Sequence, residues 1–110
     1  MNDFQQVKFE IFIPEAYIER LQAELHKIGV GRIGDYDHCL SITEVRGTWR
    51  PLAGSQPYAG EVGQVSEGTE CKVEINCPRD KASAALAVIR QVHPYDEPLV
   101  NIIPLVNHLF

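Results

Sequence analysis

The sequence has little positive charge and no block of it. Its 15 Asp and Glu residues outnumber its 10 Lys and Arg residues, so the formal net charge is −5 at pH 7. A protein that binds a phosphate backbone gathers its basic residues on one face or one stretch of chain, whereas here they are dispersed among acidic residues. We therefore expect no nucleic-acid partner.

Long hydrophobic runs are missing as well. No apolar stretch approaches the ~20 residues that a membrane-spanning helix needs. The N-terminal stretch MNDFQQVKFE lacks the charged segment and apolar core of a secretion signal. The sequence accordingly predicts a protein without a membrane partner, located in the cytoplasm.

Cysteine is scarce and shows no pairing pattern. The 3 cysteines form an odd number, and none belongs to a C-x-x-C motif. Cys71 and Cys77, if they lie on one strand, would be roughly 20 Å apart at the usual rise per residue, which is far beyond the reach of a disulfide. We expect free thiols in a reducing compartment.

Catalytic and metal-binding motifs are absent too. The 4 histidines show neither H-x-x-x-H nor H-E-x-x-H spacing, and no Ser-His-Asp or Cys-His order can be argued from the chain. The sequence therefore assigns no catalytic residue. It favours a non-enzymatic protein and leaves an enzyme as the alternative.

The composition indicates one domain over residues 1–110, because this length and a hydrophobic content of 45% suit a single modest core. Alternating apolar and polar residues predict strands at 7–13, 36–45, 69–77 and 99–106. Apolar residues at helical spacing predict one helix between Pro14 and Gly29 and another over 78–92. The order β-α-β-β-α-β predicts an α+β ferredoxin-like fold, an antiparallel sheet with both helices on one face.

The last predicted strand, 99–106, is apolar on both faces apart from Asn101 and Pro104. Two-sided apolarity predicts burial on both sides, yet two helices cover only one face of such a sheet. A second copy of the chain would supply the missing cover most simply. We therefore expect a homo-oligomer.

The stretch GVGRIG, residues 29–34, spells the G-x-G-x-x-G pattern of a dinucleotide-binding turn. In that turn the glycines follow a strand and open a helix, whose N-terminus holds the pyrophosphate. Here they follow a predicted helix and lead into a predicted strand. We interpret them as a helix C-cap and a tight turn, and not as a nucleotide site.

The residues that follow, DYDHC, bring a histidine next to a cysteine. On a strand His38 and Cys39 would point to opposite faces, so they would not share one metal, and Cys39 is predicted to be buried. His38, at the start of the strand and near the glycine turn, is a candidate functional residue. His26, on the polar face of the first helix, and His108 are predicted to be only solvated.

Two further segments are candidates for function. Residues 47–63, GTWRPLAGSQPYAGEVG, hold too many glycines and prolines for a regular element and predict a long loop. HPYDEP, residues 93–98, places an imidazole, a phenol and carboxylates in a connection bounded by prolines. It is either a rigid turn, with Tyr95 packed and Asp96 capping backbone N–H groups, or a rigidly held metal or ligand site.

Separate motifs in the right order resemble one family. They are the run from Gly29 to Cys39, GTWRP with Gly54 and Pro57, GEVG at 60–63, and HPYDEP. Together they resemble the inserted domain of YqfO-type proteins of the NIF-three-like family, over residues 7–105. HPYDEP is also similar to the H-P-Y-E-x-P segment of the CutA divalent-cation-tolerance proteins, with Asp96 at the family's glutamate. Leu99 stands where CutA usually has another glutamate.

The resemblance implies a ferredoxin-like subunit related to CutA and to the PII signalling proteins, which typically form trimers. We therefore favour a trimer over a dimer. It also implies that the dinuclear metal ligands of YqfO-type proteins lie in flanking halves that this chain lacks. The cyclohydrolase label attached to the larger family is accordingly not carried over.

These observations favour a non-enzymatic oligomeric binding or regulatory module of the PII/CutA-like type, whose 47–63 loop and HPYDEP turn line clefts between subunits. The candidate ligand-binding residues are Arg50, Tyr58, Glu61 and Tyr95, with Arg50 facing an anionic ligand. The candidate ligands of a divalent metal, copper or zinc, are His38, His93 and Glu97.

Two alternatives remain open. The first is a hydrolytic enzyme that uses a metal held by His38, His93 and Glu61 across subunits, with water in an open position. The second is an accessory subunit that docks onto a NIF-three-like metal-centre protein.

Overall fold

A computed structural model describes residues 3–110. Its regular elements are β1 (Gln6–Ile13), α1 (Ile18–Lys27), β2 (Ser41–Trp49), β3 (Ser66–Pro78), α2 (Ala82–Val92) and β4 (Val100–Leu105). One-turn 3-10 helices precede the two α-helices, at Glu15–Tyr17 and Arg79–Lys81, and a third, Asn107–Leu109, follows β4. The predicted element order is therefore confirmed.

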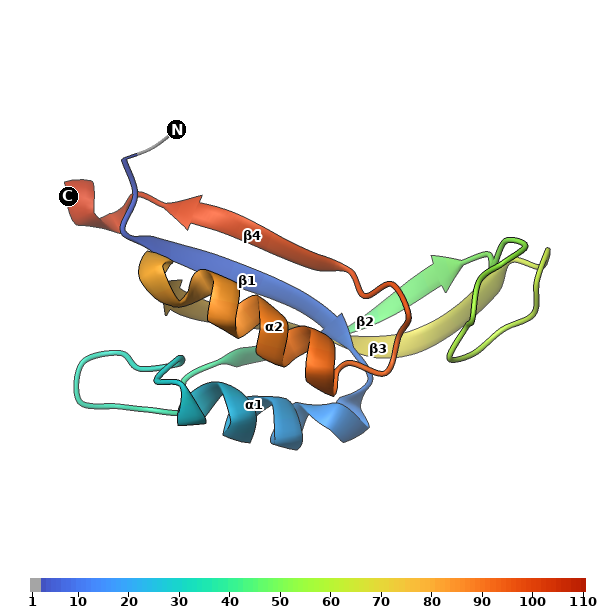
Figure 1. Cartoon of the computed structure of the whole chain (residues 1–110), viewed down its shortest axis with the longest axis horizontal. Helices are drawn as coiled ribbons and strands as arrows, with labels where there is room; N and C mark the ends of the chain where they lie inside the picture. The colour runs from blue at the N-terminus through green and yellow to red at the C-terminus, as the bar shows by residue number, and fades with distance from the viewer. Residues whose placement is uncertain (1–2) are drawn as a thin grey trace.

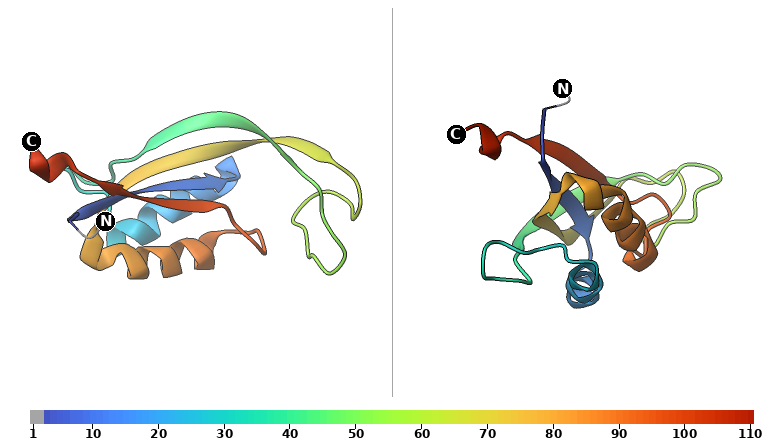
Figure 2. Two further views of the ribbon diagram at one scale, coloured as in Figure 1. Left: turned by 90° about the horizontal axis from the view of Figure 1, so that it is seen from above. Right: turned by 60° about the vertical axis from the view of Figure 1, so that its left-hand side comes forward.

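The strands form one antiparallel sheet in the order β2-β3-β1-β4. Both helices lie on the same side of this sheet, and within residues 3–110 no other element covers its opposite side (Figures 1 and 2). The predicted ferredoxin-like arrangement of one sheet and one helical layer is confirmed.

The core lies between the sheet and the helices. Alternate residues of β1 and β3 are buried, as their period-2 pattern predicts, and they meet the apolar stripes of α1 and α2. The buried hydrophobic residues are Val7, Phe9, Ile11, Ile13, Ile18, Leu21, Leu25, Val30, Cys71, Val73, Ile75, Cys77, Ala85, Ile89 and Val92.

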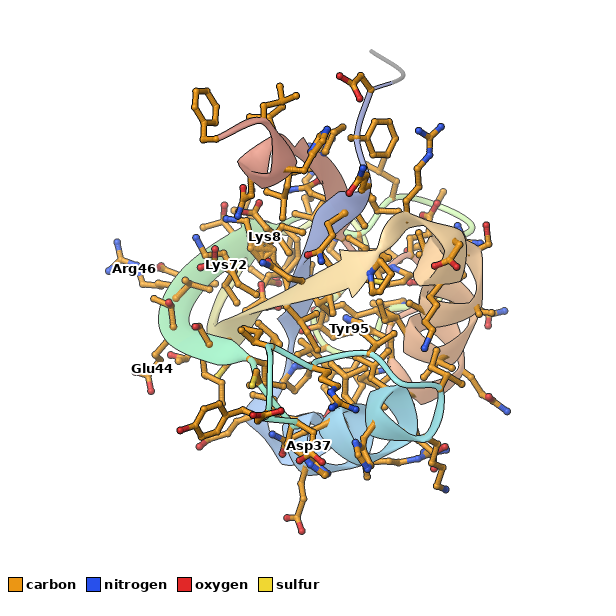
Figure 3. The ribbon with its side chains drawn as sticks, turned by 90° about the vertical axis from the view of Figure 1, so that its left-hand side faces the viewer. Lys8, Asp37, Glu44, Arg46, Lys72 and Tyr95 are labelled. Carbon is orange, nitrogen blue, oxygen red and sulfur yellow. The ribbon has the colours of Figure 1, made fainter. Side chains whose placement is uncertain are left out.

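The uncovered face of the sheet carries charged residues at the centre. Lys8 Nζ lies 2.7 Å from Glu74 Oε2, and Lys72 Nζ lies 3.9 Å from Glu74 Oε1. The bond to Glu74 raises the pKa of Lys8, and the same bond lowers the pKa of Glu74. Figure 3 shows Lys8 and Lys72 on the side of the sheet away from the helices.

Helix α1 ends in a Schellman motif, as the interpretation of the glycines predicts. Gly29 N–H donates to the His26 carbonyl at 2.9 Å and Val30 N–H donates to the Leu25 carbonyl at 3.0 Å. Gly29 has φ 77°, a left-handed conformation that glycine adopts without penalty. Val30 and Leu25 are both buried and supply the hydrophobic contact of the motif.

The second strand is shifted from its predicted range of 36–45. Residues Ile33 and Tyr36 instead close a tight turn, with N–H to carbonyl bonds of 2.8 and 3.0 Å in the two directions, and the strand begins at Ser41. It runs on to Trp49 because Val45 to Trp49 continue to pair with Ser66 to Glu70 of β3. The long loop therefore covers 50–65 and not 47–63.

Strand β4 is not buried on both sides within one chain, as expected for a sheet that two helices cover on one face only. It lies at the edge of the sheet, and Ile102 and Ile103 are 42% and 37% exposed. Ile102 pairs with Phe9 and Ile103 with Lys8, so these isoleucines point to opposite faces of the sheet. The second apolar face of β4 therefore lies on the uncovered side.

The three cysteines are free, as predicted, with Cys71 and Cys77 buried. Burial raises the pKa of the Cys77 thiol to about 11. Cys39 is only partly buried, because it precedes β2 in an irregular segment. Among the described residues, no helix has the length and apolar character that crossing a membrane requires.

Candidate functional site

Two candidate groups of polar and aromatic residues belong to segments that lie toward opposite ends of the long axis of the molecule (Figure 1). The first, which we call the loop–turn junction, is formed by the 50–65 loop and the 93–98 turn. The second, which we call the histidine cluster, consists of His26, Asp37 and His38 and lies where α1 ends.

The 50–65 loop is held in shape by bonds to its own base. Trp49 Nε1 donates to the Ala59 carbonyl at 3.0 Å, and Gly63 N–H donates to the Pro51 carbonyl at 2.8 Å. Gly60 has φ 96°, and a Cβ there would lie 2.7 Å from Ser66 Oγ and 3.0 Å from Trp49 Nε1. Only glycine fits at this position, so the loop has a defined fold close to the hairpin tip.

The loop reaches the 93–98 turn through one hydrogen bond and a group of aromatic rings. The Gln56 N–H donates to Asp96 Oδ2 at 2.8 Å. The ring of Tyr58 lies 5.5 Å from that of Tyr95 and 6.4 Å from that of Tyr17, measured between centroids. A hydrogen bond and a ring contact therefore join segments some forty positions apart in sequence.

Within the turn, His93 has a structural role. It is buried, its Nε2 donates to the Phe12 carbonyl at 2.6 Å, and its Nδ1 accepts the Tyr95 N–H at 3.2 Å. This pattern requires the neutral imidazole with its proton on Nε2. Burial lowers the pKa of His93, which favours the neutral form. Both ring nitrogens are therefore occupied by protein groups.

Tyr95 and Asp96 are fixed in the same turn. Tyr95 donates its hydroxyl hydrogen to Glu70 Oε1 at 3.2 Å, and burial together with the nearby Glu70 raises the pKa of Tyr95 to about 12. Asp96 accepts the Glu97 N–H at Oδ1, at 3.0 Å, in addition to the Gln56 N–H at Oδ2. The interpretation of HPYDEP as a rigid turn with Tyr95 packed and Asp96 capping N–H groups is therefore confirmed.

The predicted ligand-binding residues all lie on this end of the molecule. Tyr58 and Tyr95 are in ring contact. Arg50 and Glu61 are exposed on the loop, and within residues 3–110 neither side chain is bonded to another residue. Glu97 is exposed beside Asp96. The tyrosine rings are thus in contact at the junction, while Arg50 and Glu61 are exposed on the same loop.

The histidine cluster forms because the segment after α1 folds back on the last turn of that helix. The rings of His26 and His38 are stacked, with centroids 4.0 Å apart and planes at 24°. His38 Nδ1 lies 2.7 Å from Asp37 Oδ1, and this hydrogen bond lowers the pKa of Asp37. One donor atom from each of the three residues lies within 4.8 Å of the others. Figure 3 shows Asp37 beside α1.

The backbone of His38 adopts an uncommon conformation. Its φ is 58°, which makes it the one non-glycine residue with positive φ among residues 3–110, and such residues tend to occur where function constrains the chain. The Gln22 side chain donates to the His38 carbonyl at 2.8 Å, and Cys39 N–H donates to the Gly31 carbonyl at 2.7 Å. These bonds hold the His38 ring over α1.

The structure does not bring His38, His93 and Glu97 together within one chain. His38 lies at the end of α1, whereas His93 and Glu97 lie beyond the end of α2, at the opposite end of the molecule (Figure 1). A site that uses His38 together with His93 or Glu61 would require a second chain, and it stays a prediction.

Sequence reasoning missed His26, Asp37 and Glu70. His26 is exposed, as predicted, but it is in contact with His38 and is not simply solvated. The spacing of His26 and His38 matches no helical or strand period, so no pattern signals the contact. The one available clue was a third polar side chain, Asp37, adjacent to His38.

Hollows in the surface occur away from the loop–turn junction. One of ≈ 420 Å³ lies between the 32–34 turn and the C-terminal 3-10 helix, and one of ≈ 350 Å³ lies between the same turn and β3. Both are open to solvent. The second is lined in part by apolar residues, among them Ile33, Leu40 and Ile75.

The fold places the chain in the class of ferredoxin-like proteins that includes CutA1 and GlnK. CutA1 from Ehrlichia chaffeensis superposes with a TM-score of 0.69 over 96% of this chain and 86% of its own, at 18% identity. GlnK from B. subtilis superposes with a TM-score of 0.64 over 93% of this chain and 86% of its own, at 23% identity. These similarities show a shared fold.

Sequence similarity points to a more specific relationship. The chain is 34% identical over 98 residues to the GTP cyclohydrolase 1 type 2 homolog of Bacillus subtilis (strain 168), and 39% identical over 101 residues to that of Mycobacterium tuberculosis (strain H37Rv). These matches cover 89% and 90% of this chain but 26% of each relative. A Bacillus cereus protein related to NIF3 superposes with a TM-score of 0.81 at 28% identity, over 94% of this chain and 26% of its own. No family model matches the sequence.

The chain is therefore homologous to a segment of NIF3-related proteins, and the resemblance to the YqfO-type proteins of the NIF-three-like family is confirmed. It spans about a quarter of the length of the relatives that it matches.

Proposed function

We propose that the protein is a non-enzymatic homo-oligomeric binding module that takes a small anionic ligand at the loop–turn junction. The ferredoxin-like fold and the NIF3-related homologues support a small binding or regulatory module. In this proposal Arg50 pairs with the anion, Tyr58 and Tyr95 form an apolar floor, and Glu61 and Glu97 select against further negative charge.

The observation that carries this proposal is the bond between Gln56 and Asp96. It ties a loop of uncommon length to the turn at its side, and the rings of Tyr58 and Tyr95 pack beside that bond. A long loop without secondary structure tends to be functional or mobile. This loop is held in place by hydrogen bonds, which favours a functional role. Pre-organised loops bind ligands at a lower entropic cost.

The oligomer is proposed on the uncovered face of the sheet. That face is flanked by β4, where Ile103 is partly exposed, and the described part of the chain lays no second layer over it (Figure 2). A second layer supplied by other copies would bury it. We propose a trimer, since the resemblance to CutA and PII proteins implies one, and in it a second chain would convert the open junction into a cleft.

A metal-dependent hydrolase is less well supported by the geometry. Both nitrogens of His93 are engaged by Phe12 and Tyr95, so His93 would have to leave these bonds to bind an ion. Docking as an accessory onto a NIF-three-like metal protein remains a proposal that rests on homology alone.

The experiment that tests the proposal is isothermal titration calorimetry of the purified protein with ATP, AMP and citrate as anionic probes. Saturable heat with at least one probe is expected, and Arg50→Gln should weaken it about tenfold or more, because a charge-assisted contact is lost. Arg46→Gln is the matched control, since Arg46 is an exposed arginine on the same hairpin that pairs with Glu67 at 2.7 Å.

Absence of saturable heat with every probe would refute the anion site. An equal loss of affinity in the Arg46 and Arg50 variants would show only a general charge effect. Light scattering on the same sample tests the assembly separately, where a trimer is expected at three times the 12.4 kDa of the chain.

A further inference from the structure

We propose that His26, Asp37 and His38 form a binding site for a divalent transition-metal ion, with zinc or copper(II) as the expected class. This site is independent of the loop–turn junction and lies within a single chain. It differs from the metal set predicted from sequence, which joined His38 to His93 and Glu97.

The distances are close to those that an ion requires. A tetrahedral zinc site with bonds of about 2.0–2.2 Å to N and O places its donor atoms roughly 3.3 Å apart. The donor atoms of the cluster already lie within 4.8 Å of one another. A contraction of up to about 1.5 Å by side-chain rotation would complete the set, and imidazole and carboxylate donors suit zinc and copper.

Rotation of the rings is open to both histidines. Their stacked planes, at 24°, hold the in-plane lone pairs side by side and not yet pointed at one ion. His26 and His38 are both exposed, so their rings can turn toward solvent, and the contacts that change are those within the cluster itself. Three protein donors would leave a fourth position for water.

Asp37 serves the site as a ligand. Its Oδ1 lies 2.7 Å from His38 Nδ1, which is close to the spacing of two donor atoms on one ion. Nδ1 gives up its proton when the ion takes the place of this hydrogen bond. Asp37 also supplies the negative charge that a dication needs.

The backbone around the cluster favours a cation as well. His26 lies in the last turn of α1, where the helix dipole presents its negative end. The left-handed conformation of His38, with φ 58°, and the Gln22 bond to its carbonyl place the second imidazole over that end. The residue that completes the cluster thus keeps a backbone conformation that costs free energy.

The test is titration of the purified full chain with zinc chloride and with copper(II) chloride, followed by calorimetry. One ion per chain is expected. His38→Asn, in which asparagine keeps the left-handed backbone accessible, His26→Gln, which retains helix propensity, and Asp37→Asn should each weaken binding about tenfold or more.

Two control variants separate this site from other groups. His108 forms an exposed pair with Asp3 at 3.3 Å, so His108→Ala removes a histidine–carboxylate pair that has no second histidine. Cys39→Ser removes the neighbouring thiol. Both controls should bind as the parent does, and copper(II) should broaden the imidazole NMR signals of His26 and His38 before that of His93.

Either of two results would overturn the proposal. One is no saturable binding of either ion to a protein that circular dichroism shows to be folded. The other is binding that survives in His26→Gln and His38→Asn but is lost in a control variant. Because the site does not use Arg50 or the 50–65 loop, its failure would leave the anion site of the loop–turn junction untouched.

Discussion

His93 joins the end of the second helix to the end of the first strand: its Nε2 donates to the Phe12 carbonyl at 2.6 Å while its Nδ1 accepts the Tyr95 N–H. Protonation of His93 at Nδ1 would place an N–H group on the ring against the Tyr95 N–H, and this hydrogen bond would be lost. The pKa of His93 is lowered in the folded state, chiefly by burial, so the unfolded chain binds the proton more readily.

The first prediction concerns stability against pH. As pH falls below about 6.5, the ordinary pKa of histidine, the unfolded state takes up the proton first and the free energy of unfolding falls until the folded-state pKa is passed. Urea unfolding between pH 8 and pH 5 measures this slope. His93→Gln should be less stable at pH 8 but show a smaller slope. An unchanged slope would contradict the assignment of His93.

The second prediction concerns the bond between Tyr95 and Glu70. Tyr95→Phe removes a hydroxyl that donates to Glu70 Oε1 at 3.2 Å and should lower the free energy of unfolding by about 1 kcal/mol. Tyr36→Phe is the control, because Tyr36 is 76% exposed. The spectroscopic titration of tyrosine should also show one phenol that ionises near pH 12 and is absent from Tyr95→Phe. Equal stabilities of the two variants would argue against the bond.

The third prediction concerns the end of α1. Gly29→Ala places a Cβ in a left-handed conformation with φ 77° and should cost about 1 kcal/mol or more. Gly29→Asn should cost less, because asparagine tolerates this region better. Thermal unfolding of both variants checks the order, and a more stable alanine variant would show that the Schellman motif is not formed in solution.

The fourth prediction concerns assembly through the uncovered face of the sheet. Ile103 pairs with Lys8 on that face, so Ile103→Lys would place two like charges opposite each other in the proposed interface. We expect the oligomer to dissociate, as measured by light scattering. Ile33→Lys, at an isoleucine that is 58% exposed in a turn, should leave the mass unchanged. Dissociation of both variants would point to a different interface.

Most of the fold was predictable because its signals are local. The alternation of Val7, Phe9, Ile11 and Ile13 fixes the buried face of β1, and Gly29 ends α1 through a motif whose bonds span only a few residues. The start of β2 was not predictable in this way. The 33–36 turn and the left-handed His38 interrupt a run of residues whose pattern alone reads as a strand.

The sequence predicted individual residues of the candidate site but not the contacts between them. The sequence singles out His38, Tyr58 and Tyr95 by residue type and setting. The contacts of His38 with His26 and of Gln56 with Asp96 depend on how two loops fold back, and loop conformation has no period that could be recognised in advance. His38 and His93 lie far apart because the helices that precede them run in opposite directions (Figure 1).

The 50–65 loop also divides the chain into two β-α-β halves. Because the sheet order is β2-β3-β1-β4, the strands of the halves alternate, and β3 of the second half lies between β2 and β1 of the first. Neither half can close the core alone. A cut at the exposed Gly54 should therefore yield two fragments that stay associated and regain the fold when mixed, so the protein is suited to use as a split reporter.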